Sequence, residues 1–213
     1  MLKIFSFLKE SIEDENDENL LRFSKDIHTL ILDKWFGGIW EDKSGAFKRS
    51  SVPAVAEIVN SLNPESVIDV GCGFNTYLPK IDAKKKVGID PFNPAADVMQ
   101  GVYEYHQSHP NEQYDVVLAL GSINFGPRDK ILAEVACVDA LTKKGGTQVW
   151  RVNPNSGSEY NHKFPLFEFI EFFDWNKEFV EQIAEVYGYE IKEYEEEVNW
   201  EGRKRLFFVF YKY

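Results

Sequence analysis

Two aspartates and two glycines in a short stretch have the spacing of a site for a nucleotide-like cofactor. Asp69 precedes Gly71 and Gly73, and Asp90 follows Gly73 by 17 positions. Glycines at a turn between a strand and a helix let a ligand lie directly against the backbone, because a side chain there would occupy its volume. A carboxylate at the tip of the next strand can accept hydrogen bonds from both ribose hydroxyls. The pattern therefore predicts a site for an adenosine-containing cofactor at the carboxyl ends of the strands.

The charge of this stretch discriminates between two cofactors. A nicotinamide dinucleotide carries an anionic pyrophosphate, and its loop normally has a third glycine where a helix N-terminus meets the phosphates. Thr76 stands at that position here. S-adenosylmethionine instead carries a sulfonium, an amino group and no phosphate, so a carboxylate such as Asp69 beside the loop is favourable. The sequence favours the sulfonium compound.

These residues resemble a known motif. Asp69 to Gly73 is similar to the acidic-x-Gly-x-Gly motif of class I S-adenosylmethionine-dependent methyltransferases, and Asp90 is similar to their acidic residue after the second strand. The likeness covers about Ser51 to Tyr213. It implies an α/β, Rossmann-like, doubly wound and mainly parallel sheet that ends in an antiparallel hairpin. It also implies methyl transfer with S-adenosylmethionine as the cofactor, the loop holding the methionine part and Asp90 the ribose. The expected cofactor contacts are Asp69, Gly71, Cys72, Gly73, Asn75, Asp90, Pro91, Gly101, Val102, Tyr103, Leu120 and Gly121.

Two departures from the resemblance concern the adenine and the methyl acceptor. Many members have a Gly-Asp pair after the third strand, whereas Gly101 is followed here by Val102 and Tyr103. Adenine recognition is therefore expected from the backbone or from Tyr103. The (Asp/Asn)-Pro-Pro-aromatic motif of amino-directed DNA methyltransferases is missing after the fourth strand, and the similar string from Asp90 to Asn93 lies on the wrong strand. The acceptor is expected to be a small molecule or a protein side chain.

The acceptor side offers few candidates for chemistry. Methyl transfer from a sulfonium is an in-line displacement that depends largely on positioning, so no universal catalytic residue is required. A hydroxyl acceptor would need a base, and His162 is the best placed histidine. Asn124 is expected to contact the acceptor. Aromatic side chains between Tyr160 and Trp175 are expected to pack as a lid or to line an apolar pocket.

Two other functions remain open. One is a non-catalytic adenosyl-binding or interaction protein of the same fold, which keeps the glycine loop without acceptor chemistry. The other is a nicotinamide-dependent oxidoreductase, which Thr76 disfavours.

The elements that must position these residues alternate between strand and helix, as in βαβ units. An amphipathic helix from Leu20 to Ile31 is expected to stop near Gly37 and Gly38, within an N-terminal helical cap over residues 1–50; residues 51–213 form the cofactor domain. The expected strands are Val67 to Val70, Lys86 to Ile89, a weaker Asp97 to Val102, Val116 to Leu120, Thr147 to Val152, Glu190 to Val198 and Arg205 to Tyr211. The expected helices of the cofactor domain run from Val52 to Leu62, Tyr77 to Ile81, Ile131 to Leu141 with a glycine stop at Gly145 and Gly146, and Phe179 to Tyr187.

Composition narrows the class of protein. The chain has 213 residues, 44% of them hydrophobic, with a net charge of −11, which argues against a surface that neutralises long nucleic acids. Cys72 and Cys137 form no CxxC pair, so neither a disulfide framework nor a metal site is expected, and a reducing cytoplasm fits best. No apolar stretch approaches the ~20 residues that span a bilayer, so no membrane partner is expected.

Overall fold

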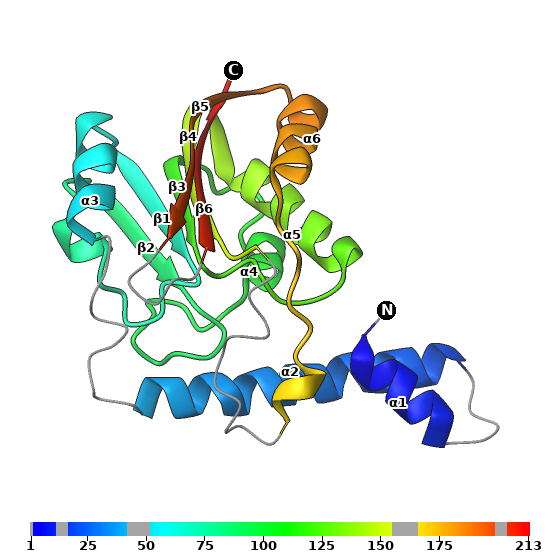
Figure 1. Ribbon diagram of the computed structural model, residues 1–213. Coiled ribbons are helices and arrows are strands. Elements are labelled where there is room, and N and C mark those ends of the chain that lie inside the picture. Colours follow the sequence, from blue (N-terminus) through cyan, green and yellow to red (C-terminus); the bar gives the residue numbers. More distant parts are fainter. Residues whose placement is uncertain (1, 12–16, 42–51, 155–165, 199–203) are drawn as a thin grey trace.

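A six-stranded sheet forms the centre of the protein. The computed structural model describes residues 2–11, 17–41, 52–154, 166–198 and 204–213. The strands are β1 (Ser66–Val70), β2 (Lys85–Ile89), β3 (Tyr114–Leu120), β4 (Thr142–Val152), β5 (Tyr189–Val198) and β6 (Lys204–Lys212), and their order across the sheet is β2-β1-β3-β4-β6-β5 (Figure 1). The first four run parallel, whereas β6 pairs antiparallel with both β4 and β5. The mainly parallel sheet and its C-terminal hairpin are confirmed.

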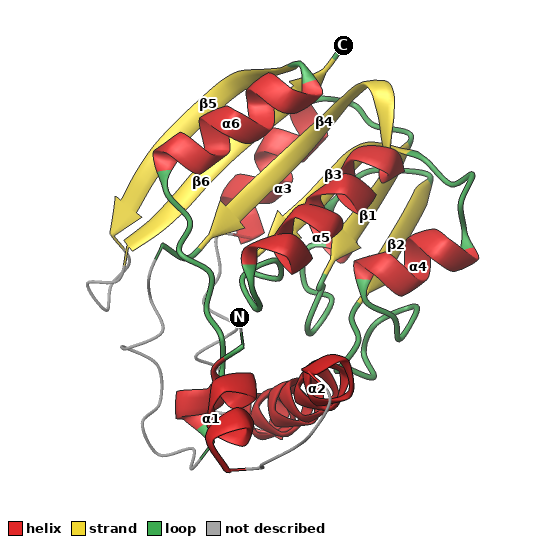
Figure 2. Ribbon diagram, turned by 90° about the vertical axis from the view of Figure 1, so that its right-hand side faces the viewer, coloured by secondary structure: helices red, strands yellow, loops and turns green. Residues whose placement is uncertain are grey.

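Helices cover the two faces of the sheet unequally. The helices are α1 (Lys3–Ser11), α2 (Asp17–Glu41), α3 (Val52–Ser61), α4 (Val102–Ser108), α5 (Arg128–Leu141), α6 (Lys177–Tyr187) and the short 3₁₀ helices η2 (Leu78–Lys80) and η4 (Phe167–Phe169). Figure 2 shows α4, α5 and α6 in front of the sheet and α3 behind it. The crossover from β1 to β2 contains only η2, so the glycine loop is not followed by an α-helix.

Strand alternation divides the core into two layers. Val67, Leu118 and Val149 point to the face of α3, while Ile68, Val117 and Trp150 point to the face of α4, α5 and α6. All six are 1% exposed or less, as expected for parallel strands that are buried on both sides. Successive residues of a strand point to opposite faces, so the same alternation fixes the face of each polar residue at the strand ends.

Two details of the predicted cofactor domain are wrong. Residues 97–102 do not form a strand: Val98 makes one isolated bridge to Ile89, because the Asp97 carboxylate accepts a hydrogen bond from Gly88 N (2.7 Å) and folds the segment back on β2. The glycines after α5 do not end that helix either. Gly145, at φ +77°, lies within β4 where its pairing with β3 shifts register, so the glycines make an irregularity in the strand.

The N-terminal part of the chain forms α1 and the long α2. The predicted stop of α2 at Gly37 is wrong, since the helix continues to Glu41. A glycine inside a helix costs roughly 1 kcal/mol relative to alanine, which the burial of the neighbouring Trp35 can offset. Within the amphipathic helix expected from Leu20 to Ile31, the apolar residues Phe23 and Leu30 are 52% and 63% exposed, whereas Leu32 and Trp35 beyond it are buried.

Candidate functional site

The turn after β1 has the backbone conformation of a glycine loop. Gly71 and Gly73 have φ of +69° and +53°, in the left-handed region that glycine adopts without strain. Four N–H groups of the turn donate to oxygens of the chain itself: Gly71 (2.7 Å) and Cys72 (3.0 Å) to the Ile89 carbonyl, Gly73 to the Asp90 carboxylate (3.0 Å), and Asn75 to the Cys72 carbonyl (2.8 Å). These donors are used within the fold and do not form a cradle for an anion.

Gly71 is also required by the packing of two loops. A Cβ atom added there would lie 2.1 Å from the Cβ of Ser122, in the loop that follows β3. The loops after β1 and β3 therefore touch at this point. The absence of a side chain at Gly71 serves this contact, a reason that the sequence alone did not reveal.

Two carboxylates flank the turn, in different settings. Asp69 is 1% exposed, and its Oδ2 has no hydrogen-bond partner among the described residues. Burial raises the pKa of Asp69 to about 7; the positive charge of Arg151 opposes this shift and the negative charge of Asp90 adds to it. Asp90 accepts hydrogen bonds from Gly73 N (3.0 Å) and Phe92 N (2.8 Å), and burial raises its pKa against the effect of these bonds. Asp90 thus holds the turn, and Asp69 is a buried acid with an oxygen to offer.

A cation, Arg151, lies near the carboxyl end of β4. Its guanidinium donates to the carbonyl oxygen of Leu120 (3.2 Å) and to the hydroxyl of Tyr77 (3.4 Å). A Cβ on Gly121 would lie 3.7 Å from the same guanidinium. The sequence pattern did not single out Arg151, because β4 contains several other polar and charged residues.

The architecture is that of known methyltransferases. It matches the 1,6-didemethyltoxoflavin-N1-methyltransferase of Burkholderia thailandensis, solved with 1,6-didemethyltoxoflavin and S-adenosylhomocysteine, with a TM-score of 0.68 and 14% identity over 88% of this chain and 89% of that one. It matches the magnesium protoporphyrin IX methyltransferase ChlM of Synechocystis, with bound S-adenosylmethionine, with a TM-score of 0.62 and 13% identity over 95% and 100%. For the N-methyltransferase NodS of Bradyrhizobium japonicum, in complex with S-adenosylhomocysteine, the values are 0.61 and 11% over 81% and 91%. The chain has the class I S-adenosylmethionine-dependent methyltransferase fold.

Sequence comparison adds no closer relative to this likeness of fold. No family model matches the chain, and no curated protein sequence matches it. The roles of individual residues in this methyltransferase fold therefore have to be argued from their geometry.

Buried polar atoms without partners gather where β1, β2 and β3 of the methyltransferase fold end. Asn124 is 1% exposed; its Oδ1 accepts a hydrogen bond from Asn153 N (3.0 Å), whereas its Nδ2 has no partner among the described residues. Four more buried side-chain atoms lack a partner among the described residues: the Oδ2 of Asp69, the Oδ1 of Asn75, the Nδ2 of Asn93 and the Oγ of Ser122. Buried polar groups are nearly always hydrogen-bonded, so unpaired donors and acceptors at one edge suit a polar ligand. The residues present thus fit an adenosyl cofactor with an amino-acid end.

The other predicted contacts have varied placements. Cys72 is buried, and burial, followed by the charges of Asp69 and Asp90, raises the pKa of its thiol far above the usual range, so it is a packed thiol and not a nucleophile. Pro91 is exposed. Gly101 precedes α4, Val102 packs into the core with 4% exposure, and Tyr103 is 49% exposed on α4. Val102 is thereby taken up by packing, and His162 lies outside the described residues.

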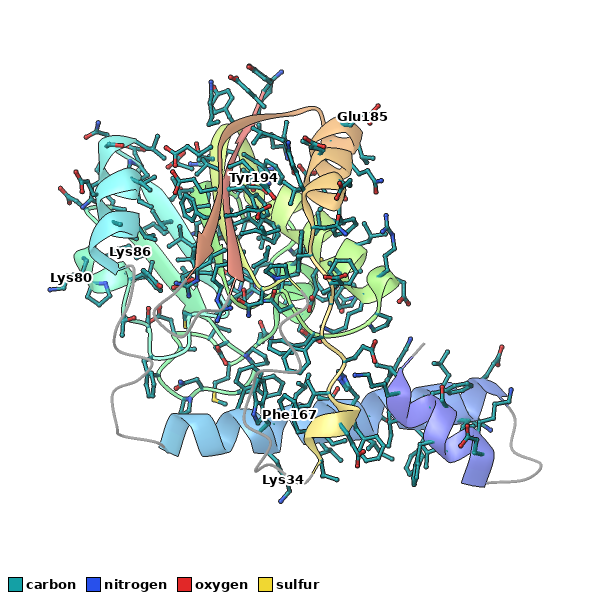
Figure 3. The ribbon with its side chains drawn as sticks, in the orientation of Figure 1. Lys34, Lys80, Lys86, Phe167, Glu185 and Tyr194 are labelled. Carbon is teal, nitrogen blue, oxygen red and sulfur yellow. The ribbon has the colours of Figure 1, made fainter. Side chains whose placement is uncertain are left out.

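A cluster of aromatic rings covers the carboxyl edge of the methyltransferase sheet. The arrowheads of β1 and β4 point toward α2, which crosses below them (Figure 2). From α2, Trp35 contacts Phe125 (5.7 Å between ring centroids) and Phe36 stacks on Phe92 (5.4 Å), so the helix meets the loops that follow β3 and β2. Phe167 of η4 lies on the sheet side of α2, and Lys34 projects from the other side (Figure 3). Helix α2 thus lies over the loops that follow β2 and β3.

His28 fastens α2 to the chain segment beyond η4. It is 4% exposed, and its Nε2 accepts a hydrogen bond from Glu171 N (3.1 Å). Burial, followed by the positive charge of Lys130, lowers the pKa of His28 to about 4, so the ring is neutral at physiological pH. His28 is therefore a buried structural group, a role that the sequence pattern did not indicate.

Within the described residues, no three histidine, cysteine, aspartate or glutamate side chains come together as a metal site. No helix in the same parts of the chain combines the length and the apolar sequence that crossing a bilayer requires.

Proposed function

We propose that the protein transfers a methyl group from S-adenosylmethionine to a small molecule. One observation carries the proposal: a glycine turn that uses its own N–H groups internally lies beside Asp69, a buried carboxylate with an unpartnered oxygen. An unpaired buried carboxylate is costly, and its cost falls when a positive group binds beside it. A ligand with an ammonium and a sulfonium meets that requirement.

The same turn argues against a dinucleotide. A pyrophosphate is normally held by free backbone N–H groups at the N-terminus of an α-helix. Here Gly71, Cys72, Gly73 and Asn75 all donate within the chain, and only the 3₁₀ helix η2 follows. Two buried carboxylates beside the turn would also repel a pyrophosphate. A nicotinamide-dependent oxidoreductase is therefore the weaker reading.

The chain's own residues divide the work of binding. Asp69 faces the amino group, and Asp90 fixes the turn and lies next to the ribose. Asn93 and Asn75 offer a donor and an acceptor beside β2, where the predicted adenosine would lie. When bound, S-adenosylmethionine supplies a methyl group on a positively charged sulfur, and a nucleophile displaces the sulfur in line.

The acceptor side needs orientation and exclusion of water. Asn124, on the loop that follows β3, offers its Nδ2 as a donor, and the ring cluster of α2 covers this edge. A cover of aromatic rings suits a small acceptor with apolar surface that fits beneath the rings, and it suits a folded protein poorly. The names of two matching structures, a 1,6-didemethyltoxoflavin-N1-methyltransferase and a magnesium protoporphyrin IX methyltransferase, also support a small-molecule acceptor. His162 remains our candidate base for a hydroxyl acceptor.

Two measurements test the proposal. Calorimetry with S-adenosylmethionine, S-adenosylhomocysteine and NAD should give binding of the two adenosyl compounds alone. Incubation with methyl-labelled donor and a host extract, followed by separation of small molecules from protein, should then place the label in the small-molecule fraction.

Each wrong outcome has a definite meaning. Binding of NAD alone would replace the proposed reaction with hydride transfer. Label in protein would keep the methyltransferase and change the acceptor. Tight donor binding without label in either fraction would favour the non-catalytic adenosyl-binding protein.

A further inference from the structure

We propose that Arg151 binds the carboxylate at the amino-acid end of the donor, so that Asp69 and Arg151 together recognise a zwitterion. The inference rests on the proposed function. It adds a specificity-determining residue at the end of β4, which the sequence motif does not contain.

The glycine turn has few hydrogen-bond donors left for the α-carboxylate of the donor. An α-carboxylate that enters this edge meets Asp69, which is 1% exposed, and Asp90, which is 5% exposed. The N–H groups of Gly71, Cys72 and Gly73 already donate to Ile89 and Asp90. A carboxylate that loses its water without gaining donors binds poorly, so a cation must come from elsewhere.

Arg151 points to the same face of the sheet as Asp69. Asp69 is two residues beyond Val67 on β1, and Arg151 is two residues beyond Val149 on β4. Val67 and Val149 both pack on the α3 face, and side chains two positions apart in a strand share a face. Both charged groups therefore point to the α3 side of the sheet at its carboxyl edge. Their proximity is sufficient for Arg151 to act electrostatically on Asp69.

The guanidinium of Arg151 has the chemistry to bind a carboxylate. Two of the contacts of Arg151, with the Leu120 carbonyl at 3.2 Å and the Tyr77 hydroxyl at 3.4 Å, hold the side chain at this edge. A guanidinium presents five donors in a planar fork that matches a carboxylate. The contacts with Leu120 and Tyr77 place that fork at the end of β3.

Lys130 is the rival cation, and it is engaged elsewhere. Its Nζ donates to the Phe125 carbonyl (2.9 Å) and pairs with Glu134 (2.6 Å). It acts on His28 under the cap and does not contribute to the pKa of Asp69. Arg151 is therefore the better placed partner for a carboxylate beside Asp69.

The test crosses a change in the protein with a change in the ligand. The probes are S-adenosylhomocysteine and its decarboxylated analogue, which keeps the adenosine, sulfur and amine, and the readout is the dissociation constant from calorimetry. The wild-type protein should prefer S-adenosylhomocysteine by about 10-fold to 100-fold, the range of a charged hydrogen-bonded pair. Arg151→Met should remove most of that preference by weakening the first ligand and leaving the second within about threefold.

Two further variants keep the result interpretable. Lys130→Met should retain the wild-type preference, as the matched loss of a cation. If Arg151→Met does not fold, Arg151→Gln, which keeps a donor for the Leu120 carbonyl without the charge, should lose the preference in its place.

Two results would overturn the proposal. Equal weakening of both ligands in a folded Arg151 variant would mean that Arg151 only maintains the shape of the edge. Failure of the wild-type protein to bind either probe would reject the proposed function itself, together with this inference.

Discussion

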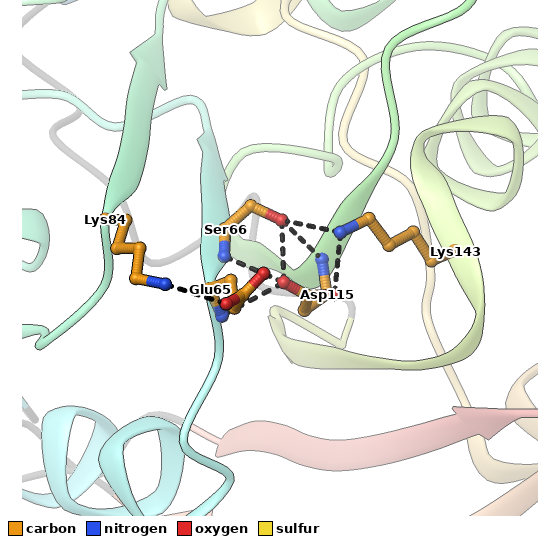
Figure 4. A network of polar contacts seen from close by, with 5 residues as sticks. All are labelled: Glu65, Ser66, Lys84, Asp115 and Lys143. Carbon is orange, nitrogen blue, oxygen red and sulfur yellow. Dashed lines mark hydrogen bonds and ion pairs between the residues drawn. The ribbon is translucent and has the colours of Figure 1, made fainter.

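The two ends of the sheet use aspartate in opposite ways. At the amino end, Asp115 accepts hydrogen bonds from Glu65 N (3.0 Å), Ser66 N (2.8 Å) and Ser66 Oγ (2.8 Å), and it pairs with Lys143 (2.8 Å; Figure 4). At the carboxyl end, Asp69 is buried with an oxygen that has no partner among the described residues. Asp115 thus has several hydrogen-bond partners, whereas Asp69 keeps an oxygen without a described partner.

The pKa values of the two acids follow this difference. Burial alone would raise the pKa of Asp115, but its bonds to Lys143 and Ser66 outweigh burial and lower it. At Asp69, burial prevails and raises the pKa to about 7, against the opposing charge of Arg151. We infer that the amino edge stabilises the fold, while the carboxyl edge carries a cost that a ligand relieves.

The largest expected effect is steric and lies at the carboxyl edge. Gly71→Ala places a Cβ 2.1 Å from that of Ser122 and also forces alanine to φ +69°. Left-handed strain and overpacking together should lower the free energy of unfolding by about 3–5 kcal/mol, measured by urea denaturation.

Gly188→Ala is the matched control for this change. Gly188 has nearly the same φ, +67°, and nothing lies within 4 Å of its added Cβ, so only the conformational cost of about 1 kcal/mol should remain. Similar losses for the two variants would contradict the close contact between the loops after β1 and β3.

The next effect is the loss of a satisfied acid. Asp115→Ala leaves the N–H groups of Glu65 and Ser66 without their acceptor and should lower the free energy of unfolding by about 2–3 kcal/mol at pH 7. Because the folded-state pKa of Asp115 is lowered, this stabilisation should be present above pH 4 and fade as the pH falls below it. Calorimetry of the same variant should give an unchanged affinity for S-adenosylhomocysteine. A weakened affinity would mean that the amino edge also contributes to ligand binding.

Asp69→Asn should act in the reverse direction. The folded-state pKa of about 7 lies above the ordinary 3.8, so the ionised acid costs stability at high pH, and this cost is absent below pH 4. The full shift corresponds to a ceiling of about 4 kcal/mol, and about 2 kcal/mol of gain is expected at pH 8, since the buried amide also lacks partners. Denaturation at pH 8 and pH 5 should show the gain shrink, while the affinity for S-adenosylhomocysteine falls.

An Asp69→Asn protein that is less stable than wild type at pH 8 would mean that the acid already has a compensating partner. Unchanged ligand affinity in the same protein would remove Asp69 from the binding site.

The sequence predicted only part of the carboxyl edge of the sheet, for a physical reason. Asp69, the glycine turn and Asp90 belong to two consecutive strands, so local pattern and spacing placed them correctly. Arg151 and Ser122 reach the turn through strand pairing over long sequence distances, which no local pattern records. The ring cluster joins residues of α2 to residues of the loops after β2 and β3, which are far apart in the sequence, so no local pattern predicted that they meet. The weak strand at Asp97 to Val102 failed because one side-chain bond to Gly88 reversed the chain.

The smallest expected effect lies at the amino edge, at its outermost ion pair. Lys84 and Glu65 lie 2.9 Å apart, but their side chains are 84% and 73% exposed (Figure 4). Water and salt screen such a pair, and ordering two long side chains opposes what attraction remains. Lys84→Gln should therefore leave the urea midpoint unchanged at 0.15 M salt, whereas Lys143→Gln, which removes a donor to both Asp115 and Ser66, should lower it slightly. A clear loss for Lys84→Gln at 0.15 M salt that disappears in 1 M salt would show that the stabilising network extends to the surface through charge, beyond the hydrogen bonds of Asp115.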